Sequence, residues 1–355
     1  MIKIDGSYGE GGGQILRSTL TLSAILGKSV EIFNIRAGRK KPGLQPQHLT
    51  GVRAVAEICN GKLEGDDLLS QRIVLHPGKI QSGSYEFDVM KVKSSAGSTG
   101  MIFQQIAPVL AFGNKNSNVV LKGGTHTDWA PPIDYLQDIF LPTAAKMGFH
   151  ASLDIERWGW FPIGQGIVKA KIQPVQGKLR AIELTDRGKL KRISGLSLVS
   201  RLPLSIAERE RDKALQRLKD VGHWTLDIET KSVPSLGTGN YFCLIAEFEN
   251  SIAGFSSLGK IGKRAEKVAD EAADQLIKYY KSKACIEKHL ANQLILYMAL
   301  AEGKSLFSSE ISNHVLTNIW VVEQFLPVKF VIKGKPGEVG SVSVKGLGSK
   351  PSSAK

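Results

Sequence analysis

Apolar residues recur along the chain with the periods of alternating helices and strands. One face of residues 14–26 carries the apolar side chains of a helix, namely Ile15, Leu16, Leu20, Leu22, Ile25 and Leu26. A strand (29–35), a basic loop (36–43), a helix (45–58) and a strand near 62–66 are predicted to follow. These elements form one βα-type unit.

The same order of elements is predicted twice more. The second unit comprises helix 101–112, strand 118–122, loop 123–132, helix 133–147 and strand 149–155. The third comprises helix 289–301, strand 304–308, loop 309–313, helix 314–325 and strand 327–332. A spacing of 25 residues joins Gln14 to Arg39, Gln104 to Trp129 and His289 to His314. We therefore expect the middle loops of three related units to meet at one cleft.

Residues 181–279 interrupt this repeat. Strands are predicted at 181–186, 191–199, 224–229 and 241–248, and helices at 203–219 and 262–280. The expected fold class is α/β (α+β), with a large domain of three βα-type repeats (1–180 plus 280–340) and a smaller inserted α+β domain (181–279). The segment 345–355 is rich in Gly, Ser, Pro and Lys, and we expect it to be disordered.

A formal net charge of +14 indicates a polyanionic partner, which fits nucleic acid best but also a nucleotide or a membrane surface. Aromatic residues make up only 7%, so contacts with nucleic acid are expected to be led by phosphates. The sequence has no apolar run that would span a bilayer and no secretory leader. The widely spaced Cys59, Cys243 and Cys285 predict neither disulfides nor zinc. A cytoplasmic location is expected.

The stretch 5–13 is rich in glycine and opens into the first helix. Glycine permits close approach of a ligand, and the free N–H groups of a helix start attract anions. Glu10 is a candidate metal ligand on such an anion, and Arg17 a candidate clamp. The alternative is a strand, a turn and a helix with a solvated Glu10.

The loop 36–43 holds four basic residues within six positions, which favours a compact phosphate receptor over a solvated charged turn. In the second unit, Trp129 and the proline pair that includes Pro131 are candidates for one wall of a nucleobase pocket, with Gln104 reading a base or a phosphate. Trp129 equally suits the cap of a hydrophobic core.

His314 stands at a predicted helix start. The positive field there lowers the pKa of an imidazole, and a neutral imidazole can act as a nucleophile or base. A structural or exposed histidine is the alternative.

Together the segments DGSYGEGGGQILR, RAGRKKPGLQPQH, GGTHTDWAPP, HLANQ and SNHVLTNI resemble the RNA 3′-terminal phosphate cyclase family. The resemblance implies three repeats, similar to the C-terminal domain of a translation initiation factor, and a smaller insert. It also implies ATP-dependent conversion of RNA 3′-phosphate ends to 2′,3′-cyclic phosphodiesters, with release of AMP and pyrophosphate. His314 would be adenylated before AMP passes to the RNA. The partners implied are ATP, RNA and Mg²⁺ or Mn²⁺, with no obligate protein partner.

By resemblance, Glu10 matches the metal ligand, and Arg17, Arg36 and Arg39 match phosphate contacts. The matching nucleotide contacts are Gln104, Pro131, His289, Leu290, Ala291, Asn292 and Gln293. Two positions depart from the pattern. His289 stands where some relatives have tyrosine, and Asn292 replaces the usual aspartate, which changes a hydrogen bond expected to adenine or ribose.

Two other functions fit the same fold. A cyclase-like binding module of ribosome assembly would lack the histidine, whereas His314 is present. A small-molecule transferase of the enolpyruvyl type would share the three repeats and a basic cleft, but HLANQ and His314 argue against it.

Overall fold

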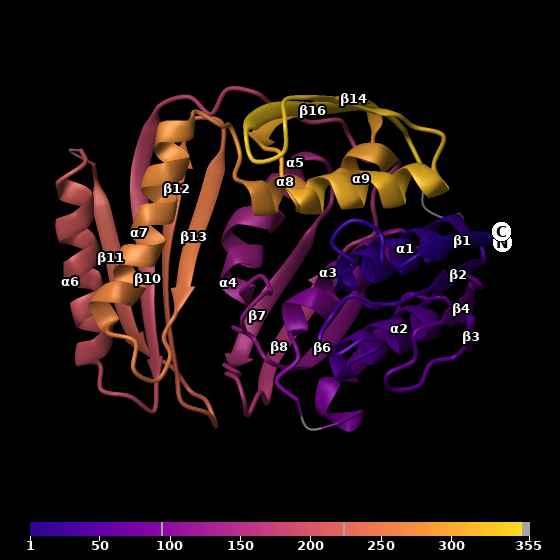
Figure 1. The fold of residues 1–355 in the computed structure, drawn as a ribbon, viewed down its shortest axis with the longest axis horizontal. Coiled ribbons are helices and arrows are strands. Elements are labelled where there is room, and N and C mark those ends of the chain that lie inside the picture. The colour runs from indigo at the N-terminus through magenta and orange to yellow at the C-terminus, as the bar shows by residue number, and fades with distance from the viewer. Residues whose placement is uncertain (94, 223, 350–355) are drawn as a thin grey trace.

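The structure, a computed structural model, describes residues 1–93, 95–222 and 224–349. Three repeats of one topology make up the larger part (Figure 1). The first repeat contains β1 (Ile2–Asp5), α1 (Gly13–Leu26), β2 (Val30–Phe33), α2 (Pro46–Ile58), β3 (Lys62–Glu64) and β4 (Ile73–His76). Its sheet has the order β1-β2-β4-β3, with β1 parallel to β2 and the other pairs antiparallel.

The second repeat gives the order β5-β6-β8-β7. It contains β5 (Ser84–Asp88), η1 (Val89–Lys91), α3 (Thr99–Ala111), β6 (Ser117–Gly123), α4 (Ile133–Tyr135), the π-helical η2 (Leu136–Phe140), α5 (Leu141–Lys146), β7 (Ala151–Arg157) and β8 (Gly166–Ile172). As in the first repeat, the first two strands are parallel, and the last strand in sequence lies between the second and the third.

The third repeat contains β9 (Glu183–Leu184), α8 (Lys288–Leu300), β14 (Glu302–Glu310), α9 (Asn313–Phe325), β15 (Phe330–Lys333) and β16 (Val339–Leu347). Its sheet follows the same rule, with β9 parallel to β14 and β16 between β14 and β15. The expected α/β class with three related units is therefore confirmed. Strands β4, β5, β8 and β16 of the repeats were not predicted, and neither was β13 (Ile252–Leu258) of the insertion.

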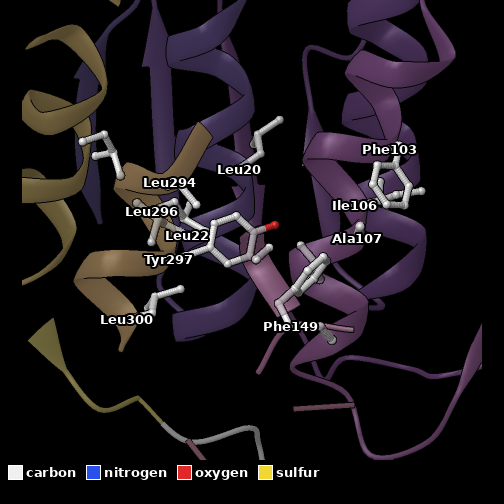
Figure 2. Packing of buried hydrophobic residues seen from close by; sticks show 14 of the residues in the cluster. Leu20, Leu22, Phe103, Ile106, Ala107, Phe149, Leu294, Leu296, Tyr297 and Leu300 are labelled. Carbon is white, nitrogen blue, oxygen red and sulfur yellow. The ribbon is translucent and has the colours of Figure 1, made fainter. Parts of the chain in front are cut away.

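The helices of the three repeats share one core (Figure 2). Leu20 and Leu22 of α1, Phe103 and Ile106 of α3, and Leu294 of α8 are among its buried side chains. The Thr21 hydroxyl also donates to the Gln105 carbonyl at 2.8 Å, which ties α1 to α3. This shared core fixes the relative positions of the helix ends from which the site is built.

The insertion leaves the third repeat after β9 and returns at α8. It contains β10 (Leu190–Ser200), α6 (Ser205–Lys219), β11 (Leu226–Ser232), β12 (Gly239–Phe248), β13 (Ile252–Leu258) and α7 (Ala265–Ser282), and its sheet has the order β11-β10-β12-β13. Helices α6 and α7 cover one face of the sheet (Figure 1). The side chains between them form a separate core, which includes Phe242, Leu244 and Leu276.

Arg187 joins the two segments by which the chain enters and leaves the insertion. The Arg187 guanidinium donates to the carbonyl oxygens of Tyr279, Tyr280 and Ala284, at 3.1, 2.5 and 3.2 Å. It also lies 4.8 Å from the centroid of the Phe248 ring. The incoming and outgoing segments are therefore fastened together.

Two boundaries differ from those predicted. The strand expected at 181–186 is the short β9, which pairs with β14 in the third repeat and not within the insertion. At the other end, β16 includes residues 345–347, which were expected to begin a disordered tail. Ser341, Val342, Ser343 and Val344 alternate with the period of a strand, and the Gly, Ser, Pro and Lys residues that follow them led to the prediction of a tail. Residues 350–355 of the expected tail lie outside the described residues.

Candidate active site

His314 is the second residue of α9. The Ser312 hydroxyl caps this helix by accepting a hydrogen bond from the Val315 N–H at 3.2 Å, which fixes where α9 begins. The Nδ1 atom of His314 lies 2.7 Å from Glu10 Oε2. Burial lowers the pKa of the imidazole; Glu10 opposes this shift and nearby cations contribute to it. The pKa shift expected from the helix start thus has the predicted direction, with burial as its main cause.

The glycine turn that carries Glu10 lies between α9 and the basic loop. Gly9 and Gly11 have φ values of +56° and +53°, a region that favours glycine. From the opposite side, Arg39 Nη2 donates to the Glu10 carbonyl at 2.9 Å. The structure thus brings the predicted metal ligand, the predicted nucleophile and one predicted phosphate ligand together.

The side chain of Arg36 forms hydrogen bonds within the basic loop. Its Nη1 donates to the carbonyls of Lys41 and Gly43, at 2.5 and 3.0 Å. Burial, together with the charge of Arg39, lowers the pKa of its guanidinium. Arg36 therefore shapes the basic loop, and Arg39 is the arginine that reaches the glycine turn.

A network of amide side chains joins α1, α8 and α9. Gln14 Nε2 donates to Asn292 Oδ1 and to the His314 carbonyl, both at 2.8 Å. Asn318 Nδ2 donates to the Asn292 carbonyl at 2.9 Å, and the Ser18 hydroxyl donates to Asn318 Oδ1 at 2.7 Å. Asn292 is thus held by its neighbours, and the first turn of α9 is anchored to α1.

A pocket opens beside this network. Its lining comes from α1, α3, η2, α8 and α9, and consists of Gln14, Arg17, Ser18, Thr21, Gln104, Pro108, Phe140, Asn292, Gln293, Leu296, Tyr297 and Asn318. Burial lowers the pKa of Arg17 to about 10, so its guanidinium remains charged at neutral pH. Among the described residues it has no ion pair or hydrogen bond. The Gln293 Oε1 is buried without a partner, so both groups are free to bind a polar ligand.

The remaining predicted contacts are spread more widely. His289 is exposed at the start of α8, and its backbone N–H donates to the Glu287 carboxylate at 2.6 Å. Leu290 and Ala291 are completely buried in the shared core, so their side chains have no surface with which to contact a nucleotide. Pro131 lies against Gly100 at the start of α3 and not in the pocket. Trp129 is 98% exposed, which excludes the core-capping interpretation.

The 25-residue spacing does not mark equivalent positions. Gln14 and His289 are the second residues of α1 and α8, whereas Gln104 is the sixth residue of α3. At the other end of each interval, Arg39 and Trp129 lie in loops and His314 lies in a helix. The repeat is correct, but the register inferred from this spacing is wrong.

His48 was not among the predicted site residues. Its Nδ1 accepts a hydrogen bond from the Gln45 N–H at 3.2 Å, and its Nε2 faces Gly13. Burial, with smaller effects of Arg36 and Arg17, lowers the pKa of His48 to about 3, so the ring is neutral at pH 7. Its position in the first turn of the helix that follows the basic loop was the available signal in the sequence.

The site fits a metal–nucleotide ligand. No group of three or more His, Cys, Asp or Glu side chains that could hold a metal occurs in the described part of the chain. Glu10 as a single carboxylate suits Mg²⁺ or Mn²⁺, which take further oxygens from phosphates and water. Arg17 and Arg39 supply charge for those phosphates, and the free Gln293 Oε1 supplies an acceptor for a donor group.

Comparison with known proteins agrees with the resemblance seen in the sequence motifs. A family model described as "RNA 3′-terminal phosphate cyclase" matches residues 8–332. The chain belongs to the RNA 3′-terminal phosphate cyclase family. A relative of that name from Nostoc punctiforme is 42% identical over 92% of this chain and 94% of its own length. Another from Methylococcus capsulatus is 41% identical over 92% and 91%, and one from Pyrobaculum neutrophilum is 40% identical over 98% and 99%.

The family model and the alignment with the Pyrobaculum neutrophilum relative extend over the insertion as well as over the three repeats. None of the helices within the described ranges is both long and apolar enough to cross a bilayer.

Proposed function

We propose that this protein uses ATP to convert RNA 3′-phosphate ends into 2′,3′-cyclic phosphodiesters, with His314 as nucleophile. The observation that carries the proposal is the contact between Glu10 Oε2 and His314 Nδ1. When Nδ1–H donates to the carboxylate, the Nε2 lone pair is free to attack phosphorus.

The chemistry has three steps. His314 Nε2 attacks the α-phosphorus of ATP, and pyrophosphate leaves as the N–P bond forms. An oxygen of the RNA 3′-phosphate then attacks the same phosphorus, which breaks the N–P bond and gives an RNA–adenylate anhydride. Finally the neighbouring 2′-hydroxyl attacks the RNA phosphorus, loses its proton and expels AMP. The last step is intramolecular, so proximity supplies much of the acceleration.

The charges of the site suit these steps. ATP and an RNA end repel one another, and the negative charge must be balanced while phosphoryl groups transfer. Arg17 has no charged partner among the described residues, and Arg39 lies over the glycine turn. A divalent metal on Glu10 would neutralise charge on the phosphates of the nucleotide.

We assign the nucleotide to the side of the site formed by α3 and α8. Gln104, Asn292 and Gln293 line the pocket, and the exposed His289 is free to stack on a base. Pro131 is retained as a nucleotide contact, although it lies outside the pocket. We assign catalysis to the repeats (1–180 plus 280–340), and we place the protein in the cytoplasm.

A labelling experiment tests the nucleophile. Wild-type protein incubated with Mn²⁺ or Mg²⁺ and ATP labelled in the α-phosphate should become covalently labelled, and the label should be lost on addition of RNA 3′-phosphate. His314→Ala should abolish labelling. His76→Ala is the matched control, since His76 is an exposed histidine on β4. Full labelling of His314→Ala would show that another residue is the nucleophile.

A further inference from the structure

Thirteen large hydrophobic residues are strongly exposed in the described part of the chain, and six of them lie on five loops at one end of the insertion sheet. These loops comprise residues 125–131, 158–164, 201–204, 233–238 and 259–264, and together we call them the junction surface. The six exposed residues are Trp129, Phe161, Ile163, Leu204, Leu236 and Ile261. Such a concentration marks an interaction site.

Pairing in the insertion sheet brings three of these loops together. Ser200 at the end of β10 pairs with Gly239 at the start of β12, and Tyr241 pairs with Leu258 at the end of β13. Val199 of β10 pairs with Ser232 at the end of β11. The loops 201–204, 233–238 and 259–264 therefore leave the sheet at the same end.

The second repeat supplies the other two loops and fixes them to these three. The backbone N–H of Trp158 donates to the Pro234 carbonyl at 3.0 Å, and the indole Nε1 of Trp160 donates to the Ser200 hydroxyl at 2.9 Å. The Trp160 indole lies where a Cβ at Gly239 would be, so only glycine fits there. The junction surface is thus held in one arrangement by buried contacts.

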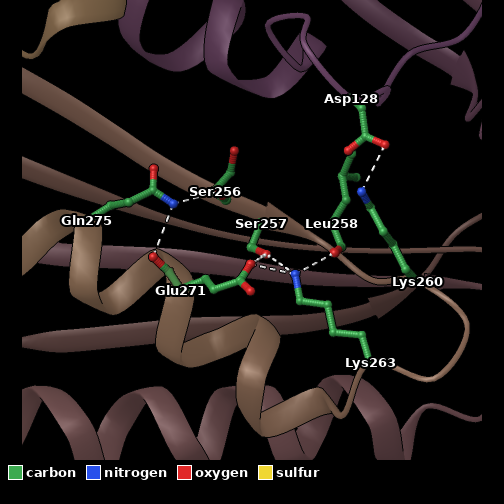
Figure 3. Close-up of polar contacts among 8 residues, drawn as sticks. All are labelled: Asp128, Ser256, Ser257, Leu258, Lys260, Lys263, Glu271 and Gln275. Carbon is green, nitrogen blue, oxygen red and sulfur yellow. Dashed lines mark hydrogen bonds and ion pairs between the residues drawn. The ribbon is translucent and has the colours of Figure 1, made fainter.

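The last of these connections is an ion pair. Lys260 Nζ lies 3.1 Å from Asp128 Oδ2 (Figure 3), and Asp128 directly precedes the exposed Trp129. The neighbouring Lys263 is held by Glu271, Ser257 and the Leu258 carbonyl, which fixes the loop 259–264 against α7. Trp129 has a φ of +64°, an unfavourable conformation for a bulky residue. The surrounding contacts therefore hold an indole out in solvent.

The charge of the junction surface is positive. Its loops carry four cations, of which Lys260 pairs with Asp128, Lys263 with Glu271 and Arg264 with Glu266, and the fourth is Arg201. Arg201 is exposed and has no ion pair among the described residues. Aromatic side chains beside cations are the combination that binds single-stranded nucleic acid, because bases stack on the rings while the cations contact phosphates.

The junction surface also adjoins the candidate active site. Gly164 packs against Ala96, where a Cβ at Gly164 would lie 3.0 Å from the Ala96 Cα atom. Two residues further on, the Ser98 N–H donates to Gln47 Oε1 at 2.7 Å, and Gln47 is the second residue of α2. Residues 95–98 therefore connect this surface to the helix start that follows the loop carrying Arg39.

We propose that the junction surface binds the single-stranded RNA upstream of the reactive 3′ end, with Trp129 and Phe161 stacking on its bases. This inference rests on the proposed function for the identity of the RNA, but it concerns a separate surface and gives the insertion a role. Its occupant is RNA and not a second protein, because exposed rings lie on the same surface as Arg201, a cation with no ion pair among the described residues.

Binding of labelled RNA tests the inference without requiring catalysis. We would measure by fluorescence anisotropy the affinity for a single strand of about 20 nucleotides, ending in a 3′-hydroxyl so that no reaction occurs. Trp129→Ala with Phe161→Ala should weaken binding by about tenfold or more. Trp129→Phe should retain most of the affinity, and Val331→Ala, an exposed apolar residue on β15, is the matched control.

Two further measurements separate the possible failures. Cyclisation of a 3′-phosphorylated dinucleotide, which offers no upstream strand to the junction surface, should be equal in wild type and the double variant. If the wild type does not cyclise the dinucleotide, the proposed function is contradicted, whereas the RNA-binding result remains valid. Unchanged affinity of the double variant for the long strand overturns the inference, as does a wild-type dimer in sedimentation that the substitutions dissociate without affecting RNA binding.

Discussion

Glu10 Oε2 lies 2.7 Å from His314 Nδ1, although the two residues come from opposite ends of the chain. One carboxylate therefore orients the imidazole and remains able to offer its second oxygen to a metal. This double use is open to test because glutamine retains an acceptor but has no charge.

We expect Glu10→Gln to slow formation of the covalent adenylate by about 10- to 100-fold, since the amide oxygen can still accept from Nδ1–H but binds a metal poorly. Glu10→Ala should be slower still, because it also frees the ring to rotate. The rates would be measured in a single turnover with labelled ATP. Equal rates for Glu10→Gln and wild type would show that the charge of Glu10 is not needed.

Replacement of Asn292 tests the departure from the aspartate expected by resemblance. Oδ1 of Asn292 accepts from Gln14 Nε2, and its Nδ2 donates to Gln14 Oε1 at 3.4 Å, so Asn292→Asp replaces this donor with a second acceptor beside the pocket. We expect the variant to fold and to favour ATP over GTP by up to about tenfold more than wild type, the value of one charge-assisted hydrogen bond. Competition between the two nucleotides in covalent labelling measures this ratio. An unchanged ratio would place the nucleobase away from residue 292.

Two glycines near the basic loop should respond differently to alanine. A Cβ at Gly13 would lie 2.5 Å from His48 Nε2, whereas a Cβ at Gly38 would meet no atom within 4 Å. Gly13→Ala should cost about 1–3 kcal/mol of unfolding free energy and should reduce labelling, because α1 or the buried His48 must move. Gly38→Ala should leave both unchanged. Urea denaturation and labelling would be measured for both variants, and equal behaviour would contradict the close packing of Gly13.

Glu210 should make stability depend on pH. Its side chain is completely buried in the insertion, where Oε2 accepts from Ser197 and Asn240 while Oε1 has no partner. Burial raises its pKa above that of the unfolded chain, so the folded state prefers the proton. Stability from this group is present at low pH and is lost as pH rises through the raised pKa.

Glu210→Gln removes this titration, and the variant should lose less stability than wild type between pH 5 and pH 8. The difference in unfolding free energy between the two pH values would be measured by urea denaturation. Parallel pH profiles for the two proteins would mean that Glu210 stays ionised in the folded state.

Local patterns in the sequence predicted most helices and the class of fold. The 3.6-residue period of apolar positions identified α1, and the helix predicted at 314–325 placed His314 at the start of α9. Glu10, Arg39 and His314 were also named in advance, because their loops are short and chemically distinctive. The contacts join these three residues of the first and third units, whereas the loop 123–132 of the second unit, which was expected at the same cleft, contacts the insertion through Asp128 and Lys260.

Contacts between distant segments were not predictable from these patterns. Nothing local shows that the last strand of each repeat returns to the middle of its sheet, so β4, β8 and β16 were missed. The bond between Gln14 and Asn292 depends on how α1 and α8 pack in the shared core. The HLANQ motif likewise does not reveal that the side chains of Leu290 and Ala291 are buried, because one helix turn carries both buried and accessible positions.

Arg187 holds together the two crossings by which the chain enters and leaves the insertion. Because β9 pairs with β14 before the chain reaches this fastening, every strand pairing of the third sheet is made outside residues 188–284. Excision of that segment, with a short linker in its place, would leave the backbone ladders of all three repeats intact and would instead uncover Trp160 and Ile139, which pack against Gly239 and Gly254 of the insertion.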